Sequence, residues 1–278
     1  MQLHGHTIAV CSWSLQPKSM AELVAKVKKL GVNHMQLALN ELSQMEPAKR
    51  QAELAELKAS GIQLTGGMLH FAGEDYSSIA RIRETGGFIP DGEWGDRKKI
   101  TADVAKLAKE LNAGAILAHV GFVPPHGHAG YKPAVERVRE VAKMLAAQGL
   151  VLHMETGQEP AGELLSFMND LNEPNVFINF DPANMILYGA GEPIPAIKLL
   201  GKHIKHVHAK DATASARPGV EWGAEVPFGT GQVGVKRFLS ALKEVGYTGP
   251  LALEREAGDN RLGDIAAGIE AIKSNVPA

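Results

Sequence analysis

The chain has 278 residues, of which 29 are Lys or Arg and 31 are Asp or Glu, so its formal charge is −2. This length suits one large α/β barrel or two ordinary domains, and the balanced charge gives no electrostatic reason to expect a nucleic-acid or membrane partner. A single cysteine, Cys11, excludes a disulfide framework within the chain. No apolar run reaches the roughly 20 residues of a membrane helix and no secretory leader precedes the first strand, so we expect a soluble, cytoplasmic protein.

Eight short apolar or β-branched runs follow one another along the chain, and their composition predicts buried strands. Longer segments with apolar residues at three- and four-residue spacing lie between them and predict helices, several of which stop at a glycine. The predicted strands are residues 8–12, 34–39, 63–69, 115–120, 150–155, 176–181, 204–208 and 251–254. The predicted helices are residues 20–30, 47–60, 101–111, 133–148, 235–245 and 264–274.

This alternation of strands and helices is typical of parallel strands joined by crossover helices. With eight strand candidates it predicts a single (β/α)8 TIM barrel that spans residues 1–278. Two long segments, 71–99 and 210–234, interrupt the rhythm, and both follow a predicted strand. Because the loops after barrel strands build the active-site face, we predict that these segments cover the site and do not mark domain boundaries.

Four acidic or imidazole residues stand at the ends of the last four predicted strands: Glu155, Asp181, His208 and Glu254. A parallel barrel brings those strand ends together, and three carboxylates with one imidazole suit Mn2+, Mg2+ or Co2+ better than structural zinc. Any one of them alone is equally well explained as a helix cap or a surface ion pair. Their shared position on consecutive strands favours one divalent-metal site.

The motifs METGQE, NFDPANM, HVHAKD and ALEREAG, with GTGQV between the last two, resemble the xylose-isomerase-like barrel superfamily of sugar and sugar-phosphate isomerases and epimerases. The resemblance covers nearly the whole chain. It implies that the same four residues bind the metal, most often Mn2+, and that Glu155 and Glu254 move protons on opposite faces of a substrate carbon. It also implies a carbohydrate substrate and a homodimer or homotetramer.

Two departures from the ketose 3-epimerases of that superfamily affect the predicted substrate contacts. Asn184 stands three residues after Asp181, where those epimerases resemble DxxH, and we expect it to hydrogen-bond a substrate hydroxyl. Their arginine after the seventh strand has no equivalent at the same spacing, and Arg217 replaces it only if the inserted loop folds back. His119 and His70, at the ends of the fourth and third strands, are further candidates for substrate binding, with a loop hydrogen bond as the alternative for His70.

Three features near the seventh strand leave other possibilities open. Lys210 is expected to be exposed or ion-paired, and Asp211 to orient a metal ligand. The segment FGTGQVG lacks the Lys-Ser/Thr ending of a P-loop but remains a possible contact for a sugar phosphate.

The sequence thus predicts a metal-dependent sugar or sugar-phosphate isomerase or epimerase that acts through an enediolate, with Glu155 and Glu254 as the proton-transfer residues. The alternative is a keto-sugar lyase, dehydratase or deglycosylating enzyme, in which proton removal is followed by β-elimination. That alternative gains weight if His119 or His70 is placed to protonate a leaving group. A non-catalytic sugar-binding barrel is less favoured, and an apurinic endonuclease is disfavoured because the chain lacks the positive charge of a DNA-binding groove.

Overall fold

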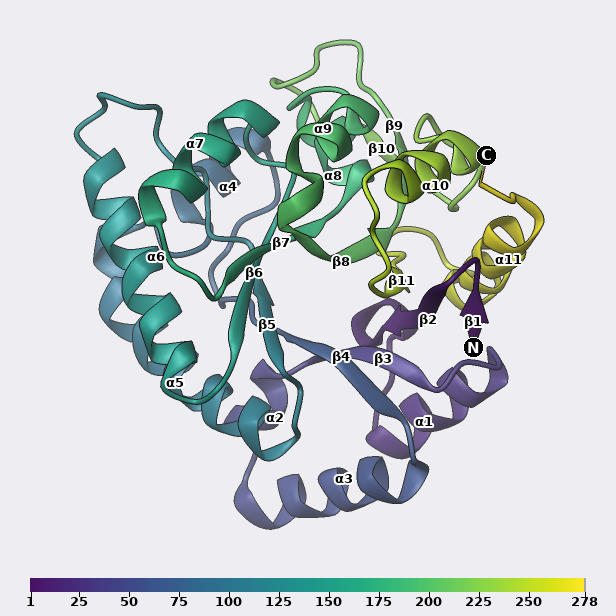
Figure 1. Cartoon of the computed structure of the whole chain (residues 1–278). Coiled ribbons are helices and arrows are strands. Elements are labelled where there is room, and N and C mark those ends of the chain that lie inside the picture. Colours follow the sequence, from purple (N-terminus) through teal and green to yellow (C-terminus); the bar gives the residue numbers. More distant parts are fainter. Residues whose placement is uncertain (278) are drawn as a thin grey trace.

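The computed structural model describes residues 1–277, and parallel strands close into a barrel at its centre (Figure 1). The strand order is β2, β11, β8, β7, β6, β5, β4, β3, and pairing of β2 with β3 closes the ring. The predicted (β/α)8 barrel is therefore confirmed. Its strands are β2 (His6–Cys11), β3 (His34–Ala38), β4 (Gln63–Met68), β5 (Ala115–Ala118), β6 (Val151–Glu155), β7 (Val176–Phe180), β8 (Ile204–Ala209) and β11 (Leu251–Leu253).

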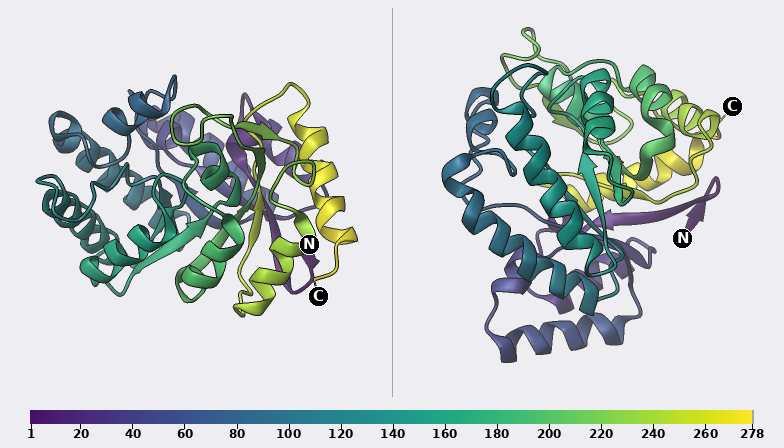
Figure 2. Two further views of the ribbon diagram at one scale, coloured as in Figure 1. Left: turned by 90° about the horizontal axis from the view of Figure 1, so that it is seen from above. Right: turned by 60° about the vertical axis from the view of Figure 1, so that its left-hand side comes forward.

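Helices surround the barrel as an outer layer, which the two further views show from other sides (Figure 2). All six predicted helices are present, although α5 begins at Trp94 and not at residue 101. The helices α7 and α9 were not among them, and the prolines at the start of α9 are accommodated in its first turn, where no backbone donor is needed. The outer helices are α1 (Met20–Lys29), α3 (Pro47–Ser60), α5 (Trp94–Glu110), α6 (Tyr131–Ala146), α7 (Ala161–Leu171), α9 (Pro193–Leu200), α10 (Val235–Glu244) and α11 (Arg261–Ser274).

Short additional elements follow the barrel strands at their carboxyl ends. The segment 71–99 contains α4 (Ile79–Thr85) and the beginning of α5, and the segment 210–234 contains a small antiparallel pair formed by β9 (Asp211–Thr213) and β10 (Ala224–Val226). A further short strand, β1 (Gln2–Leu3), pairs antiparallel with β2. The remaining elements are η1 (Ser12–Leu15), α2 (Asn40–Gln44), α8 (Pro182–Tyr188), η2 (Asp91–Glu93) and η3 (Gly201–His203).

Alternation along each strand separates an apolar outer face from a more polar barrel interior. On β6, Leu152 and Met154 belong to the apolar core, while His153 and Glu155 lie on the opposite face. Deeper in the barrel, His206 is bound through one ring nitrogen by the Asn179 amide oxygen at 2.8 Å and through the other by a Thr65 hydroxyl at 3.0 Å. Among residues 1–277, no helix has the length and apolar character required to cross a membrane.

Candidate metal centre

The four predicted ligands meet at the carboxyl ends of β6, β7, β8 and β11. Glu155 ends β6, Asp181 follows β7 and begins α8, His208 lies on β8, and Glu254 follows β11. One ligand atom from each lies within 4.8 Å of the others. All four side chains are buried, and none is more than 6% exposed. The barrel therefore gathers a compact set of three carboxylates and one imidazole away from bulk water.

The imidazole of His208 lies at the centre of the cluster, with its Nδ1 facing the three carboxylates. Its Nδ1 lies 3.0 Å from Glu155 Oε1, 3.0 Å from Glu254 Oε2 and 3.6 Å from Asp181 Oδ2. Ligand atoms that share a metal at about 2.0–2.2 Å are separated by distances of this kind. Within residues 1–277, Glu155 Oε2, Asp181 Oδ2 and Glu254 Oε2 have no hydrogen-bond partner, so a cation is the natural counterpart for this cluster.

Gln36 fixes the orientation of the imidazole. Its Oε1 lies 2.6 Å from His208 Nε2, and because an amide oxygen can only accept, the ring donates its proton at Nε2. Burial opposes the charged form of the ring, but Glu254 and Glu155 help to hold the pKa of His208 well above its usual range, so Nδ1 carries a proton toward the carboxylates. With Nε2 held by Gln36, Nδ1 is the atom that would bind a metal in place of that proton. Gln36 was not among the predicted site residues, although a polar residue flanked by a methionine and a leucine within a strand is a signal that could have indicated it.

The buried charges of the cluster influence one another strongly. Burial raises the pKa of Asp181 to about 6. Burial also opposes ionisation of Glu155, but the charges of His119 and His208 hold its pKa below the usual range. For Glu254, the charges of Lys210 and His208 outweigh burial and hold the pKa well below the usual range. Ionised carboxylates at this depth need compensating cations, and a bound divalent ion fits that need.

Lys210 is a buried cation next to the cluster, although exposure was one of the two expectations for it. Its ammonium lies 3.2 Å from Glu254 Oε2, 3.8 Å from Asp181 Oδ2 and 2.5 Å from Glu256 Oε2. The side chain is 2% exposed, and the neighbouring carboxylates keep its pKa well above the usual range despite burial. Lys210 therefore supplies fixed positive charge beside Glu254.

The two glutamates differ in how their oxygens are used. Glu254 Oε1 accepts a hydrogen bond from Trp13 Nε1 at 2.7 Å, and its Oε2 faces His208 and Lys210. Glu155 Oε1 faces His208 and accepts from the Asn184 amide at 3.1 Å, whereas its Oε2 has no hydrogen-bond partner. Among residues 1–277, Glu254 Oε2 also lacks a hydrogen-bond partner, but it lies 3.0 Å from His208 Nδ1 and 3.2 Å from the Lys210 ammonium. Glu155 Oε2 has its ion-pair contact only at 3.6 Å, with His119, and we call it the uncommitted oxygen.

His119 and Asn184 both lie beside Glu155. His119 Nε2 is 3.6 Å from the uncommitted Glu155 Oε2, and its Nδ1 is buried without a hydrogen-bond partner. Asn184 donates to Glu155 and has its amide oxygen 3.4 Å from the ammonium of Lys210. A Cβ at Gly157 would lie 2.4 Å from Asn184 Cβ, so this close approach requires glycine.

The other two predicted substrate contacts lie in different places. His70 lines the cavity above the centre, but its Nε2 is paired with Glu41 Oε1 at 3.3 Å and its side chain is 43% exposed. Arg217 is paired with Glu221, its side chain is 65% exposed, and it is not among the residues that line the cavity. The inserted loop does not bring Arg217 to the centre.

Asp211 organises the loop that contains FGTGQVG. Its carboxylate accepts hydrogen bonds from the backbone N–H groups of Ala212, Gly229, Gly231 and Val233, at 2.9 to 3.0 Å. A Cβ at Gly231 would lie 2.3 Å from Asp211 Oδ1, which explains the glycine. These donors are occupied by a carboxylate and do not form a phosphate cradle. Asp211 was expected to orient a metal ligand, and its hydrogen bonds instead hold the backbone of this loop.

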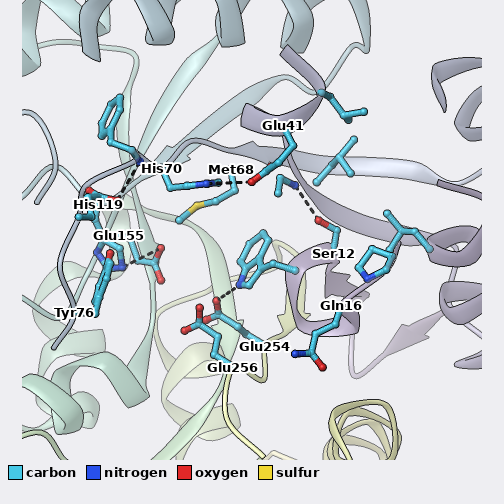
Figure 3. A pocket seen from close by; sticks show the side chains of 18 of the residues that line it. Ser12, Gln16, Glu41, Met68, His70, Tyr76, His119, Glu155, Glu254 and Glu256 are labelled. Carbon is cyan, nitrogen blue, oxygen red and sulfur yellow. Dashed lines mark hydrogen bonds and ion pairs between the residues drawn. The ribbon is translucent and has the colours of Figure 1, made fainter. Parts of the chain in front are cut away.

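A cavity of about 900 Å3 opens above the metal centre. Glu155, Glu254, His119, Asn184 and Lys210 line it. Figure 3 shows Glu155, His119 and Tyr76 on one side of the pocket and Ser12 and Gln16 on the other. The uncommitted oxygen of Glu155 and the nearby imidazole of His119 thus belong to a space large enough for a small organic molecule.

Comparison with known proteins assigns the chain to one family. The family model described as xylose isomerase-like TIM barrel matches residues 24–275. Inosose dehydratase of Clostridium botulinum (strain Eklund 17B / Type B) is 30% identical over 115 residues, which cover 37% of this chain and 38% of that protein. The chain spans about two fifths of the length of the first curated relatives that it matches.

Three solved structures share the fold. A xylose isomerase domain protein from Planctomyces limnophilus is 33% identical, with a TM-score of 0.87 over 97% of this chain and 96% of that chain. A xylose isomerase-like TIM barrel protein from Mycobacterium smegmatis in complex with magnesium is 16% identical, with a TM-score of 0.72 over 99% and 100%. D-psicose 3-epimerase of Clostridium cellulolyticum H10 is 17% identical, with a TM-score of 0.72 over 98% and 100%.

Proposed function

Because the chain belongs to the xylose isomerase-like TIM barrel family, we propose that it is a divalent-metal-dependent lyase that acts on a keto-sugar or keto-polyol. In the proposed reaction a proton is removed beside the carbonyl and an oxygen substituent is then lost from the next carbon. One observation carries this proposal: on one wall of the cavity, the uncommitted Glu155 Oε2 lies 3.6 Å from His119 Nε2.

The residues at the strand ends fit a divalent cation. Glu155, Asp181, His208 and Glu254 would hold it, with Mn2+ as the first choice and Mg2+ or Co2+ as alternatives for this donor set. A bound cation would polarise the substrate carbonyl and stabilise the negative charge that develops on its oxygen. The solved Mycobacterium smegmatis neighbour, which contains magnesium, is consistent with such a site.

Glu155 and His119 then divide the proton transfers. Glu155 accepts the proton from the carbon next to the carbonyl, and the electron pair of that C–H bond forms a double bond to the carbonyl carbon, so that negative charge moves to the carbonyl oxygen. In the second step the carbonyl re-forms, a double bond forms to the following carbon, and the bond between that carbon and its oxygen breaks while His119 donates a proton to the departing oxygen. Water or an alcohol leaves, and no oxidant or reductant is needed.

Two further side chains, Asn184 and Lys210, position the substrate and maintain the charge of Glu254. Asn184 holds Glu155 through its amide N–H and lines the same cavity, and its oxygen, which accepts from Lys210 at 3.4 Å, has a second lone pair for a substrate hydroxyl. Lys210 keeps positive charge beside Glu254, which favours the ionised form of that ligand. We expect neither residue to exchange protons with the substrate.

An isomerase or epimerase is the second candidate, and one observation favours it: Glu155 and Glu254 both line the cavity. An epimerase needs a proton-transfer group on each face of the reacting carbon. Glu254, however, has one oxygen bound by Trp13 and the other directed into the ligand cluster. The inosose dehydratase relatives also favour elimination. A cytoplasmic location and a homodimer or homotetramer remain predictions.

Proton NMR in D2O tests the proposed function. Two samples of the protein are prepared, one with Mn2+ to measure activity and one with Mg2+ to record spectra. Each is mixed with a panel of inososes, ketoses and ketose phosphates. We expect metal-dependent loss of the C–H signal beside the carbonyl, followed by signals of a dehydrated product. Glu155→Gln should abolish both processes, because the base is removed.

His119→Gln separates the two steps. Proton exchange should persist in this variant while product formation falls by about 10²–10⁴-fold, the usual contribution of a general acid. His126→Gln is the matched control, because His126 is 71% exposed and paired with Asp170, and it should leave both steps unchanged. Exchange followed by an isomerised or epimerised sugar would favour the second candidate, and loss of exchange in His119→Gln would contradict the assigned role.

A further inference from the structure

We propose that the substrate carries an apolar substituent, which lies in an arm of the cavity beside the metal centre. This inference rests on the proposed function, because it assumes that the polar part of the substrate reacts at the centre. We define the apolar arm by the side chains that line it on the side of α1 and α2: Met20, Leu23, Leu37, Leu42 and Met45.

The apolar arm is formed by side chains from three elements of the fold. Met20 and Leu23 come from α1, Leu37 comes from β3, and Leu42 comes from α2. These four side chains are between 2% and 7% exposed, yet all of them line the cavity. Buried apolar side chains next to empty space forgo packing contacts, and an apolar ligand would restore them.

The arm is continuous with the metal centre. Trp13 lines the cavity and donates its Nε1–H to Glu254 Oε1 at 2.7 Å, which fixes the indole beside the centre. Figure 3 shows Ser12 and Gln16 on the side away from Glu155, and Glu41 and Met68 between the two sides. One substrate molecule can therefore reach both the metal centre and the apolar arm.

The size of the cavity also indicates a ligand larger than a simple sugar. Drug-sized ligands occupy cavities of about 300–1,000 Å3, and a six-carbon keto-sugar has only about a dozen non-hydrogen atoms. The cavity volume of about 900 Å3 lies near the upper end of that range. A single monosaccharide would leave much of this space unfilled.

The chemistry of the lining selects an apolar group over more sugar or a phosphate. Hydroxyl groups placed among the leucine and methionine side chains would lose hydrogen bonds to water without replacement. The cavity lining also includes Lys18, Lys49 and Glu53, which carry charges of both signs. The lining of the arm thus fits an aryl or alkyl substituent, and these charged residues do not favour a ligand of one sign.

Calorimetric binding to the full-length, Mn2+-loaded protein tests this inference without requiring turnover. The probes are D-fructose with a benzyl ether and D-fructose with a methyl ether at the C6 oxygen, far from the carbonyl. We expect the benzyl ether to bind at least tenfold more tightly than the methyl ether. The free energy gained by burying a phenyl ring exceeds the free energy that corresponds to a tenfold change in affinity.

Variants of Met45 assign the preference to the arm. Met45→Asp should reduce the benzyl preference to less than threefold, and Met45→Leu should retain it. Leu199→Asp, on the 47% exposed Leu199 of α9, is the control for the introduced charge and should behave like the unchanged protein. Thermal unfolding of each variant establishes that it is folded.

Equal affinity for the two ethers, no binding of either, or a benzyl preference that survives Met45→Asp would overturn the inference. Failure of the proposed function would look different. In that case the benzyl ether would bind with the expected preference, but no proton exchange would occur in D2O with any ketone of the panel.

Discussion

The two sides of the cavity are built in different ways. On one side, the ends of β6, β7, β8 and β11 carry charged ligands on strands whose positions are fixed by the hydrogen bonds of the sheet. On the other side, the apolar arm is formed by side chains of α1, β3 and α2. Under the two proposals above, the metal-binding side determines the chemistry and the apolar arm determines which substrates undergo it.

The largest expected effect is on the metal-binding side. Asp181→Asn should weaken Mn2+ binding by more than 100-fold, because a charged ligand is lost and even partners of metal ligands contribute about 10–100-fold. Folding should change little, because Asn can still accept the Asn184 N–H that Asp181 Oδ1 accepts at 2.9 Å. Calorimetric titration with Mn2+ measures the affinity, and Met45→Asp should bind the metal normally.

An unchanged affinity in Asp181→Asn would contradict the assigned ligand set. Since Asp181 does not line the cavity, its loss tests metal binding separately from contact with the substrate. If Met45→Asp also lost the metal, the two sides of the cavity would not be independent.

A smaller effect is expected at Asp211, which holds the loop that follows β8 on the metal-binding side. Asp211→Ala should lower the free energy of unfolding by about 2 kcal/mol, because the backbone donors of Ala212, Gly229, Gly231 and Val233 lose their acceptor, and those of Ala212 and Val233 are buried. Urea denaturation measures this loss, and hydrogen exchange should accelerate at Gly231 and Val233. Asp259→Ala, at an exposed position, is the control. Unaltered exchange at those amides would show that Asp211 does not hold the loop.

The sequence was informative about the metal-binding side for a physical reason. In a parallel barrel, a polar residue at the end of an apolar run has a fixed direction, because strand geometry alone determines where it points. The eight strands and the meeting of Glu155, Asp181, His208 and Glu254 could therefore be predicted without knowing any packing detail.

The rest depended on packing that a sequence does not display. Leu23 and Leu42 have the spacing and composition of ordinary core residues, and nothing in the pattern indicates that they face an empty arm. Lys210 looked equally compatible with a surface position, and its burial follows only from the carboxylates around it. Arg217 required a loop conformation that the sequence could not specify, and the loop places it at the surface.

The smallest expected effect concerns the His70–Glu41 pair, which lines the cavity between the two sides. The hydrogen bond to Glu41 raises the pKa of His70 and lowers that of Glu41. The stabilisation from His70 is present below its ordinary pKa near 6.5 and is lost as the pH rises through its raised value. The stabilisation from Glu41 is lost as the pH falls through its lowered value, so the pair is strongest between about pH 4.5 and 6.5.

Glu41→Gln should therefore bring the pKa of His70 back toward its ordinary value, which an NMR titration of the ring protons measures directly. The accompanying loss of stability at pH 5.5 should be no more than about 0.5 kcal/mol, because side chains that are 43% and 67% exposed are screened by water. It should vanish at pH 9, where His70 is neutral in both proteins. A His70 pKa that is unchanged in the variant would mean that Glu74, the other acidic neighbour acting on His70, maintains the shift without Glu41.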